Sequence, residues 1–535
     1  MKILTVEQMR AVEQESDSRG VTYTDLLQNA GKALAAVIGE RFAQTSPQAV
    51  LGLVGSGNNG GDTLVALTEL AKRGWQTTAY LVLPRPTQDA WLQLYRSAGG
   101  CVLFMGEDAQ YTLLDELLAG FPILLDGILG TGFHASLADE IANLLVEVKR
   151  RLKRTIHVIA VDCPSGVDCT SAEAAPQTLP AELTICMAAV KTGLLGLPAF
   201  GLVGELEVVD ISLPEDLPSW QASQMEMVAA SWVRSRLPER ALDAHKGTFG
   251  AVLMVGGGKT YSGAIKLAGK AAYLTGSGLV HLVTDENRNY QSDFLPEAIW
   301  DYFYWDDESI YEEMISPTGW NIRKASAMLL GPGWGLGKER NDFLRRLLIP
   351  PEEGHTFGFL GPVHIGNPSE KVMLPPLVVD ADALKALTSI KNWWSYLPAE
   401  TVLTPHPGEM SVLTGKSIEE IQTDRWNIAA QFSHEWGHVV VLKGALTVVA
   451  APDGRLAVIP VATPALARAG TGDVLAGMIT SLLGQKLNAY DAAAVGAWLH
   501  ANAGLYAIQQ VGSVASVLAS DVIHAIPKVF QQIGY

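Results

Sequence analysis

The chain has 535 residues, of which 48% are hydrophobic and 18% are charged, so a disordered protein is excluded. This length exceeds what one hydrophobic core normally supports, and two domains are the first expectation. The 39 basic and 56 acidic residues give a net charge of −17, which disfavours nucleic acid and anionic membranes as partners. The sequence has no apolar run of about 18 residues or more, and its charged first residues lack the apolar core of a signal peptide.

The first half of the chain alternates short apolar runs with helical patterns. Buried strands are predicted over residues 48–55, 76–83, 121–128 and 156–163, and a helix over residues 61–73. Strand, helix and strand at this spacing predict a mostly parallel sheet with helices on both faces, a Rossmann-like three-layer α/β domain. The pattern breaks over residues 211–232, so we expect one domain over 1–215, a linker over 216–228 and a second domain over 229–535.

The second half repeats the alternation and predicts a second α/β domain. Its expected strands lie at residues 249–258, 281–284, 327–333, 377–382, 401–405, 438–444 and 446–451. Helices are expected over 262–278, which is rich in small residues, and over 473–485, where the apolar side chains gather on one side.

The cysteines are Cys101, Cys163, Cys169 and Cys186, and no two of them form a CxxC pair. This usage argues against a disulfide scaffold or a zinc site and fits a reducing compartment. We therefore expect a cytoplasmic protein. We also expect a homo-oligomer that acts on a small molecule.

Three polar, glycine-rich strand ends in the first domain predict one binding crevice. Residues 52–68 place a strand, a glycine-rich loop and then a helix, whose free N–H groups suit a phosphate. Asp126 and Asp162 end two further strands, and open α/β sheets bind ligands beyond the carboxyl ends of their strands. The simpler alternative is a structural turn in which Asp62 caps the helix. The loop is not GxGxxG, so an ordinary dinucleotide fingerprint is a weak match.

The motifs NNGGD (58–62), DGILGTG (126–132), VDCPSGVD (161–168) and AELTICMAAVKTGL (181–194) resemble signatures of the NAD(P)H-hydrate epimerase family, the YjeF N-terminal domain. This resemblance spans about residues 1–215. It implies that Asp162 is the catalytic or binding carboxylate and that a potassium ion is held by Asn59, Asp126 and Ser165. The residues implied to cradle the hydrate are Asn58, Asn59, Gly60, Gly61, Asp62, Gly130, Thr131, Gly132, Phe133, His134, Ala135, Ser136 and Asp162. The chain departs from the family pattern at Thr63, Cys163, Glu182 and His134.

The segment ARAGTGDVLAGM (467–478) is the most informative part of the second domain. Gly470 and Gly472 precede Asp473, which opens an apolar helix. The N–H groups of this turn and the helix dipole form an anion hole for charge that develops on a transferring phosphoryl group. Asp473 would lie beside it and could take a proton from an attacking hydroxyl. The simpler alternative is that Asp473 is only the N-cap of the helix.

Other turns of the second half add candidate ligands. Lys443 ends a strand in VLKGALTVV (441–449), within reach of nucleotide phosphates, and His406 is expected to touch ligand from the proline-fixed loop LTPHPGEM (403–410). The segment VVDADAL (378–384) leaves two interpretations open, help with a metal ion or capping of a helix.

The motifs HKGTFGAVLMVGG (245–257), YSGA (261–264), GPGWG (331–335), VVDADAL, TPHPGE, LKGALT and AGTGDVLAG together resemble the NAD(P)H-hydrate dehydratase family of the ribokinase-like superfamily. The resemblance spans about residues 229–535 and implies a ribokinase-like α/β domain that uses ADP or ATP with Mg²⁺. The residues implied to contact the hydrate are Ala264, Gly333, His406 and Asp473, and those implied to contact the nucleotide are Lys443, Gly444, Ala445, Leu446, Thr447 and Gly472. Departures lie at Lys259, Arg468 and Ala469. We expect ADP rather than ATP, because the epimerase-first arrangement resembles bacterial forms.

Leaving-group chemistry explains why a kinase-like fold would perform a dehydration. Hydroxide leaves poorly at neutral pH, whereas phosphorylation turns the hydroxyl into a good leaving group that the ring nitrogen can expel. An epimerase on the same chain would supply the epimer that the dehydratase does not accept. The two resemblances together imply repair of hydrated NADH and NADPH, with epimerisation of the R and S hydrates in the first domain and dehydration of the S hydrate in the second.

Three alternatives are weighed against this prediction. A small-molecule kinase that phosphorylates a vitamin-precursor alcohol fits the second domain but gives the first domain no role. The departures at Thr63, Glu182 and His134 allow a first domain that only binds ligand. A redox dehydrogenase is disfavoured because GxGxxG is lacking.

Overall fold

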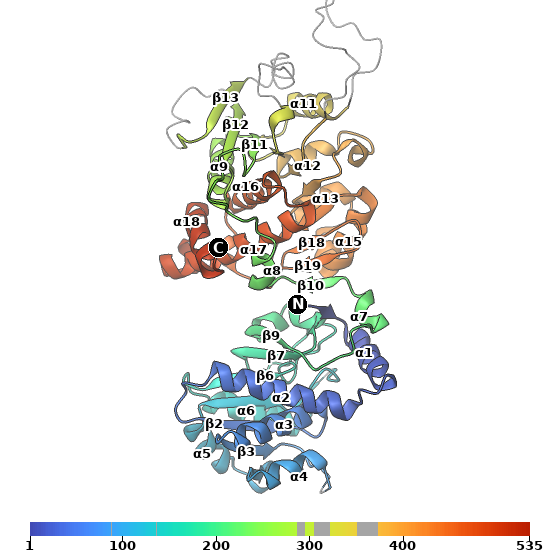
Figure 1. Cartoon of the computed structure of the whole chain (residues 1–535), viewed down its shortest axis with the longest axis vertical. Coiled ribbons are helices and arrows are strands. Elements are labelled where there is room, and N and C mark those ends of the chain that lie inside the picture. Colours follow the sequence, from blue (N-terminus) through green and yellow to red (C-terminus); the bar gives the residue numbers. More distant parts are fainter. Residues whose placement is uncertain (87, 135, 286–294, 304–321, 350–372) are drawn as a thin grey trace, which may run out of the picture. The chain divides into compact units, whose positions relative to one another are not determined.

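The computed structural model describes residues 1–86, 88–134, 136–285, 295–303, 322–349 and 373–535 (Figure 1). Contacts along the chain divide it into two compact units, Met1–Met227 and Val228–Tyr535. Each unit is built on a largely parallel sheet with helices, which confirms the predicted α/β class. The segment 216–228, expected as a linker, contains α7 (Pro218–Ala222) and β10 (Met225–Met227). Among the described residues, no helix is both long and apolar enough to cross a bilayer.

The sheet of the first unit has the strand order β4-β3-β2-β5-β6-β7-β9, and all its pairings are parallel. The strands are β2 (Ala49–Val54), β3 (Gln76–Leu81), β4 (Cys101–Phe104), β5 (Ile123–Gly127), β6 (His157–Val161), β7 (Leu183–Met187) and β9 (Glu205–Val209). The strands predicted near residues 48, 76, 121 and 156 are all present. The chain runs outward from β2 in one direction and from β5 in the other, so the switch point of the sheet lies between these two strands.

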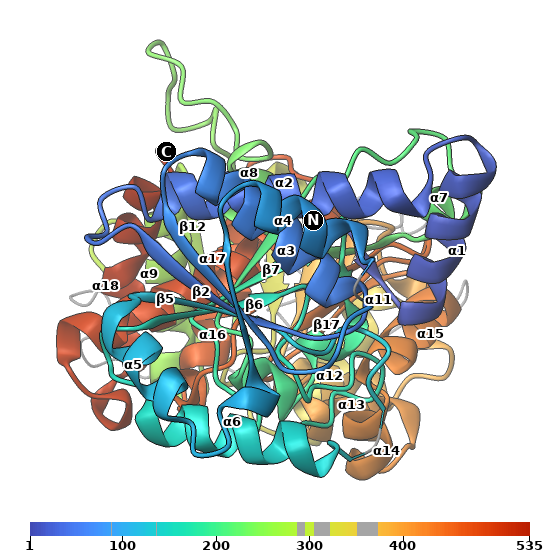
Figure 2. The same ribbon diagram turned by 90° about the horizontal axis from the view of Figure 1, so that it is seen from below.

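Alternate residues of the strands feed two separate cores, one on each face of this sheet. Val50 and Val54 pack with helices α1 (Val6–Ser18), α2 (Tyr23–Arg41), α3 (Asn58–Lys72) and α4 (Ala90–Ser97). Leu51 and Leu53 point the other way and pack with α5 (Thr112–Gly120) and α6 (Asp139–Arg151). Figure 2 shows α2 and α3 on one side of the strands and α6 on the other. The period of two in the strands therefore produces the predicted three layers.

The sheet of the second unit runs β19-β18-β17-β16-β15-β14-β11-β12-β13, with β18 and β19 antiparallel and the other pairings parallel. Its strands are β11 (Ala251–Val255), β12 (Leu279–Asp285), β13 (Ile299–Phe303), β14 (Ala327–Leu330), β15 (Leu377–Val379), β16 (Thr401–Leu403), β17 (Val439–Leu442), β18 (Val448–Ala450) and β19 (Leu456–Val458). All strands predicted for the second half are present.

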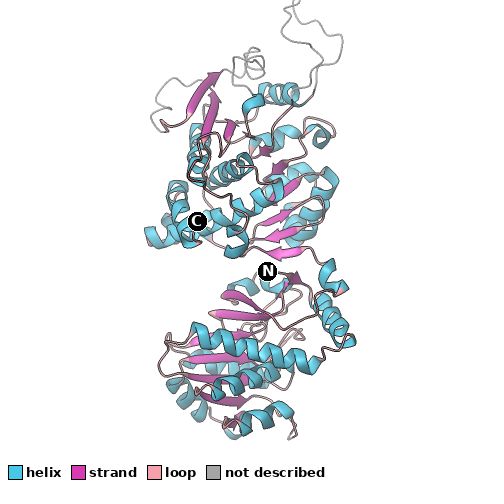
Figure 3. Ribbon diagram, in the orientation of Figure 1, coloured by secondary structure: helices cyan, strands magenta, loops and turns pink. Residues whose placement is uncertain are grey.

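Helices α9 (Ser262–Thr275), α16 (Thr471–Gly484), α17 (Ala489–Val511) and α18 (Ala519–Gln532) pack into one large core with the sheet. The helices α11 (Lys338–Leu348), α12 (Asp382–Leu387), α13 (Pro407–Thr414), α14 (Ile418–Thr423) and α15 (Arg425–Trp436) complete the unit (Figure 3). Small residues let α16 and α9 approach closely. A Cβ placed on Gly477 of α16 would lie 2.1 Å from the carbonyl oxygen of Ala268 in α9.

We expect Gly477→Ala to destabilise the second unit by about 1–3 kcal/mol, because the added methyl group would force α16 and α9 apart. The matched control is Gly263→Ala in α9, where a Cβ would meet open space. Thermal unfolding of the full chain should show a lower midpoint for Gly477→Ala and an unchanged or higher one for Gly263→Ala. Equal midpoints for the two variants would contradict this packing.

Candidate active sites

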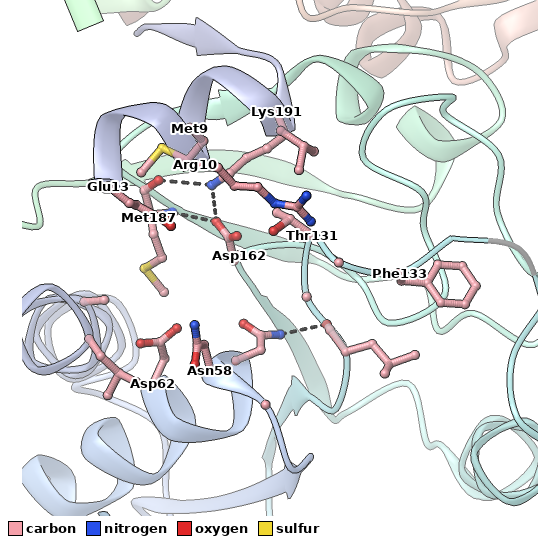
Figure 4. A pocket seen from close by; sticks show the side chains of 18 of the residues that line it. Met9, Arg10, Glu13, Asn58, Asp62, Thr131, Phe133, Asp162, Met187 and Lys191 are labelled. Atoms are coloured by element: carbon pink, nitrogen blue, oxygen red, sulfur yellow. Dashed lines mark hydrogen bonds and ion pairs between the residues drawn. The ribbon is translucent and has the colours of Figure 1, made fainter. Parts of the chain in front are cut away.

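The first unit holds a cavity of about 600 Å³ beyond the carboxyl ends of β2, β5 and β6 (Figure 4). Asn58, Asn59, Asp62, Asp162 and the loop Gly130–His134, all predicted from the sequence, line it. Gly60, Gly61 and Ser136 are not among its lining residues, and Ala135 lies outside the described residues. The three strand ends therefore meet at one cavity, as the parallel sheet requires.

The glycines of the loop after β2 serve close packing. Helix α3 begins at Asn58, and Gly57 at its N-cap supplies no side-chain hydrogen bond. A Cβ on Gly55 would lie 1.9 Å from the carbonyl oxygen of Ile128, and one on Gly60 would lie 2.1 Å from that of Gly55. The alternative in which Asp62 caps this helix is wrong. A capping side chain bonds one of the first four N–H groups of the helix, which lack a partner within it, from a position before them. Asp62 lies in the second turn, beyond these four groups.

Asp162 is held in place by a buried lysine. Its backbone has the left-handed φ of 63°, and its carboxylate accepts hydrogen bonds from the Met187 N–H at 2.9 Å and from the ammonium group of Lys191. Burial by itself would lower the pKa of Lys191, but the negative charge of Asp162 raises it above its ordinary value. The sequence prediction gave Lys191 no role, although it lies in the conspicuous segment 181–194.

The N-terminal helix contributes residues that the sequence prediction missed. Strand β1 (Ile3–Leu4) pairs with β8 (Val190–Lys191), and this pairing sets α1 beside the cavity. As a result Met9, Arg10 and Glu13 of α1 line it (Figure 4). Their spacing in the sequence is that of an ordinary amphipathic helix, which gives no sign of a site.

Asn59, Asp126 and Ser165 lie in one hydrogen-bonded network. Asp126 is fully buried and accepts hydrogen bonds from the N–H and the hydroxyl of Ser165. The amide group of Asn59 donates to the Leu129 carbonyl at 2.8 Å, and the Leu129 N–H donates to the Ser165 hydroxyl at 2.9 Å. The structure thus brings the three predicted potassium ligands together around one backbone segment.

The departures from the family pattern fall at different distances from this cavity. Thr63 is buried, and its hydroxyl group donates a hydrogen bond to the Asn59 carbonyl at 2.8 Å. The same hydroxyl group packs against Gly127, where an added Cβ would collide with it. Glu182 lies outside the cavity lining and contacts His157 at 2.6 Å. His134 lines the cavity, and its Nδ1 lies 2.9 Å from the carboxylate of Asp168.

The second unit holds a cavity of about 420 Å³. Of the predicted nucleotide contacts, Lys443, Gly444, Ala445, Thr447 and Gly472 line it, as does His406. Leu446 is buried beneath the loop, with φ of 55° and its N–H donating to the Val461 carbonyl. Ala264, Gly333 and Asp473 are not among the lining residues of this cavity.

Asp473 lies in the first turn of α16, whose N-cap is Gly470 with the left-handed φ of 91°. The alternative that Asp473 is the N-cap is therefore wrong. Burial raises the pKa of Asp473 to about 7; the charges of Asp380, Asp382 and Glu409 add to the rise, and Lys443 opposes it. This carboxyl group can therefore take up or release a proton near neutral pH.

Lys443 joins Asp473 to the other acidic residues. Its ammonium group lies 2.7 Å from Asp380 and 3.6 Å from Glu409, and a Cβ on Gly472 would lie 3.6 Å from it. Burial alone would lower the pKa of Lys443, but Asp380, Glu409 and Asp473 raise it above its usual value. A fixed positive charge thus adjoins the N–H groups at the start of α16.

The two acidic residues of segment 378–384 have separate partners. The buried Asp380 accepts a hydrogen bond from the Thr404 hydroxyl at 2.7 Å in addition to its pairing with Lys443. Asp382 is the first residue of α12, and it accepts a hydrogen bond from the Gly335 N–H at 2.9 Å. Capping of α12 by a side chain is therefore wrong, because its N-cap is Ala381 and makes no such bond.

His406 is the N-cap of α13. Its Nδ1 accepts hydrogen bonds from the N–H groups of Gly408 and Glu409, so the neutral ring carries its proton on Nε2. Burial lowers the pKa of His406, with Lys443 contributing and Glu409 opposing. His500 of α17 also lines this cavity and was missed by the sequence prediction; burial lowers its pKa to about 4.

Ala264 and Gly333, the remaining predicted hydrate contacts, adjoin one another. A Cβ on Gly333 would lie 2.9 Å from the Cβ of Ala264, and the φ of Gly333 is 68°. Lys259, the departure nearest to them, is exposed.

Comparison with known proteins gives independent findings. Residues 23–193 match the family described as YjeF-related protein N-terminus, and residues 252–528 match the family described as NAD(P)H-hydrate dehydratase. A bifunctional NAD(P)H-hydrate repair enzyme of Moorella thermoacetica is 34% identical, with 95% of this chain and 92% of the relative covered. A bifunctional NAD(P)H-hydrate repair enzyme of Escherichia coli is 30% identical, with 97% and 92% covered.

Among solved structures, an ADP/ATP-dependent NAD(P)H-hydrate dehydratase of Bacillus subtilis, co-crystallized with ATP and Mg²⁺, is 27% identical with a TM-score of 0.46. It covers 57% of this chain and 98% of its own. The two family matches fall within the two compact units, in the order predicted from the sequence. The chain therefore belongs to the family of bifunctional NAD(P)H-hydrate repair enzymes, whose members it matches along almost its whole length.

Proposed function

We propose that this chain repairs hydrated NADH and NADPH. The domain over residues 1–215 epimerises the R and S hydrates, and the domain over residues 229–535 dehydrates the S hydrate at the expense of ADP or ATP. The observation that carries the proposal is the arrangement at the start of α16, where the Asp473 carboxyl group and the Lys443 ammonium group flank a helix N-terminus. Family membership supplies the substrate, and this arrangement supplies the chemistry.

The second unit would act as a kinase whose product eliminates phosphate. The N–H groups at Gly472 and the ammonium group of Lys443 stabilise the charge on the transferring phosphoryl group. Asp473 takes the proton from the hydroxyl of the hydrate as its oxygen attacks. The ring nitrogen then expels phosphate, and loss of a proton from the adjacent carbon restores the dihydronicotinamide.

Magnesium would reach this site with the nucleotide. Among the described residues, no group of three or more His, Cys, Asp or Glu side chains is placed to hold a metal ion. Mg²⁺ commonly keeps several waters and binds one or two carboxylates together with substrate phosphates. The acidic residues Asp380, Asp382 and Glu409 near Asp473 fit that mode, in which the ion neutralises phosphate charge.

In the first unit, the loops 58–62 and 130–136 would cradle the hydrate and Asp162 would serve as its catalytic carboxylate. A potassium ion fits at Asn59, Asp126 and Ser165. Asp126 is fully buried, its hydrogen bonds come from neutral groups, and burial raises its pKa. A monovalent cation would balance that charge, because Asn59 and Ser165 add neutral oxygens of the kind that bind such ions.

We expect Asp473→Asn to abolish dehydration almost completely, with a loss of about 10²–10⁴-fold in kcat, because the amide cannot accept the proton. Recovery of dihydronicotinamide absorbance from S hydrate, Mg²⁺ and ADP or ATP measures this step. The control is interconversion of the two epimers without nucleotide, which should match that of the wild type. A variant that retained wild-type kcat would contradict the role of Asp473.

The dehydration rate should rise with pH through about 7, because Asp473 acts in its ionised form and its pKa is raised to about 7. Below that value kcat should fall about tenfold per pH unit. The residual activity of Asp473→Asn should lack this limb of the profile. A carboxyl group with this pKa titrates between about pH 5.5 and 8. A rate that stays flat over that range would refute the assignment.

Potassium should accelerate epimerisation and raise the thermal midpoint of the first unit, because it binds only the folded site. Asp126→Asn should remove both effects, since the amide carries no charge. The measurement replaces KCl by tetramethylammonium chloride at constant ionic strength. Equal potassium responses in wild type and variant would rule out Asp126 as a ligand.

A further inference from the structure

The cavity of the first unit is lined by a second aspartate besides Asp162, and this second aspartate is buried. Asp62 lies on α3, lines the cavity and is 9% exposed. No described residue gives its carboxyl group a hydrogen bond, whereas Asp162 receives one from the Met187 N–H and pairs with Lys191. Figure 4 shows Asp62 and Asp162 on opposite sides of the opening.

The two carboxyl groups have different surroundings. Burial raises the pKa of Asp62 well above its ordinary value, and the charge of Asp162 raises it further. The other charged groups that face Asp62 are Lys191 of β8, which lowers its pKa, and Glu13 of α1, which raises it. Asp162 instead has the buried ammonium group of Lys191 in contact. One acid and one base in a single cavity are the arrangement used for proton transfer to and from a substrate.

We infer that Asp62 is the general acid of the epimerisation, acting across the cavity from Asp162, and that inversion proceeds by loss and re-addition of water. This inference rests on the proposed epimerase function and names the groups that move protons within it.

The chemistry resembles that of an inverting glycosidase, in which an acid and a base flank a carbon next to a ring heteroatom. In the hydrate, the hydroxyl group is on C6, the ring carbon beside the nicotinamide nitrogen. Asp62 gives its proton to this hydroxyl group and the C6–O bond breaks. The lone pair of the ring nitrogen forms the C6=N bond as water leaves. Asp162 takes a proton from a water molecule on the other face, whose oxygen bonds to C6 while the C=N electron pair returns to nitrogen. Asp62 is then ionised and Asp162 protonated, which is the state required for the reverse inversion. The iminium cation formed when water leaves keeps both hydrogens at C5, the neighbouring ring carbon, so no dihydronicotinamide is formed.

Lys191, the buried lysine of this cavity, fits the scheme as a positioning residue. Lys191 is 1% exposed and also donates to the Met187 carbonyl at 3.1 Å, so it holds Asp162 and cannot reach the substrate without breaking the pair. Asp62, by contrast, has no hydrogen-bond partner among the described residues that an approaching hydroxyl group would have to displace.

The test uses the full chain without nucleotide and follows conversion of the S hydrate of NADH to the R hydrate by chromatography. Asp62→Asn should lower kcat by about 10²–10⁴-fold, while Asp62→Glu, which keeps a carboxylic acid, should recover part of the rate. The matched control is Asp139→Asn on the exposed start of α6, which should behave as the wild type. Dehydration of the S hydrate with added nucleotide should be unchanged in all three variants and reports on folding of the chain.

Two further measurements separate a catalytic from a structural role. In H₂¹⁸O, each inversion by the wild type should place solvent oxygen on C6, after correction for exchange without enzyme. The wild-type rate should fall at high pH as Asp62 ionises, and this fall should be absent in Asp62→Asn. Epimerised product that retains its original oxygen, or a loss below tenfold in Asp62→Asn, would overturn the inference. A wild type without epimerase activity would instead overturn the proposed function itself.

Discussion

In each unit, a buried lysine–aspartate pair ties together strand ends that are distant in the sequence. Lys191 of β8 holds Asp162 after β6, and Lys443 at the end of β17 holds Asp380 at the end of β15. Removing one partner of such a pair costs about 3–5 kcal/mol, because the other charge is left buried and uncompensated. The pairs therefore constrain where the loops beyond the sheet can lie, and both cavities form around those loops.

Each unit also has a carboxyl group near its cavity-forming loops that lacks such full compensation. Within the described parts of the chain, the Asp62 carboxyl group receives no hydrogen bond, and Asp473 is surrounded by more acidic than basic groups. The paired aspartates each contact a lysine ammonium group, whereas these two have their pKa raised mainly by burial. The carboxyl ends of the strands thus gather two kinds of acidic side chain, those paired with a lysine and those whose pKa is raised by burial.

Much of this architecture follows from local sequence patterns. The apolar runs marked the strands, and the glycine turn at Gly470–Asp473 marked the start of α16, because both signals lie within a few consecutive residues. Lys191, Glu13 and Arg10 were missed because the pairing of β1 with β8 brings them to the cavity, and a two-residue strand has no periodicity to detect. Asp62 was assigned to the cradle or to a cap, since a local sequence pattern reveals neither its burial nor the lack of a hydrogen bond to its carboxyl group from the described residues.

Joining the two activities on one chain has a kinetic consequence that does not depend on how the units are placed. A dehydratase that accepts only the S hydrate leaves the R hydrate behind, so repair of a mixed pool stops when the S form is exhausted. An epimerase supplies no free energy and cannot shift the final balance of the two epimers. It restores the S form as the phosphoryl-transfer step removes it. The coupled consumption of ADP or ATP then drives the dehydration of both epimers to completion. Equal numbers of the two sites on one chain keep their relative amounts fixed as expression varies, so neither the R hydrate nor unused dehydratase accumulates.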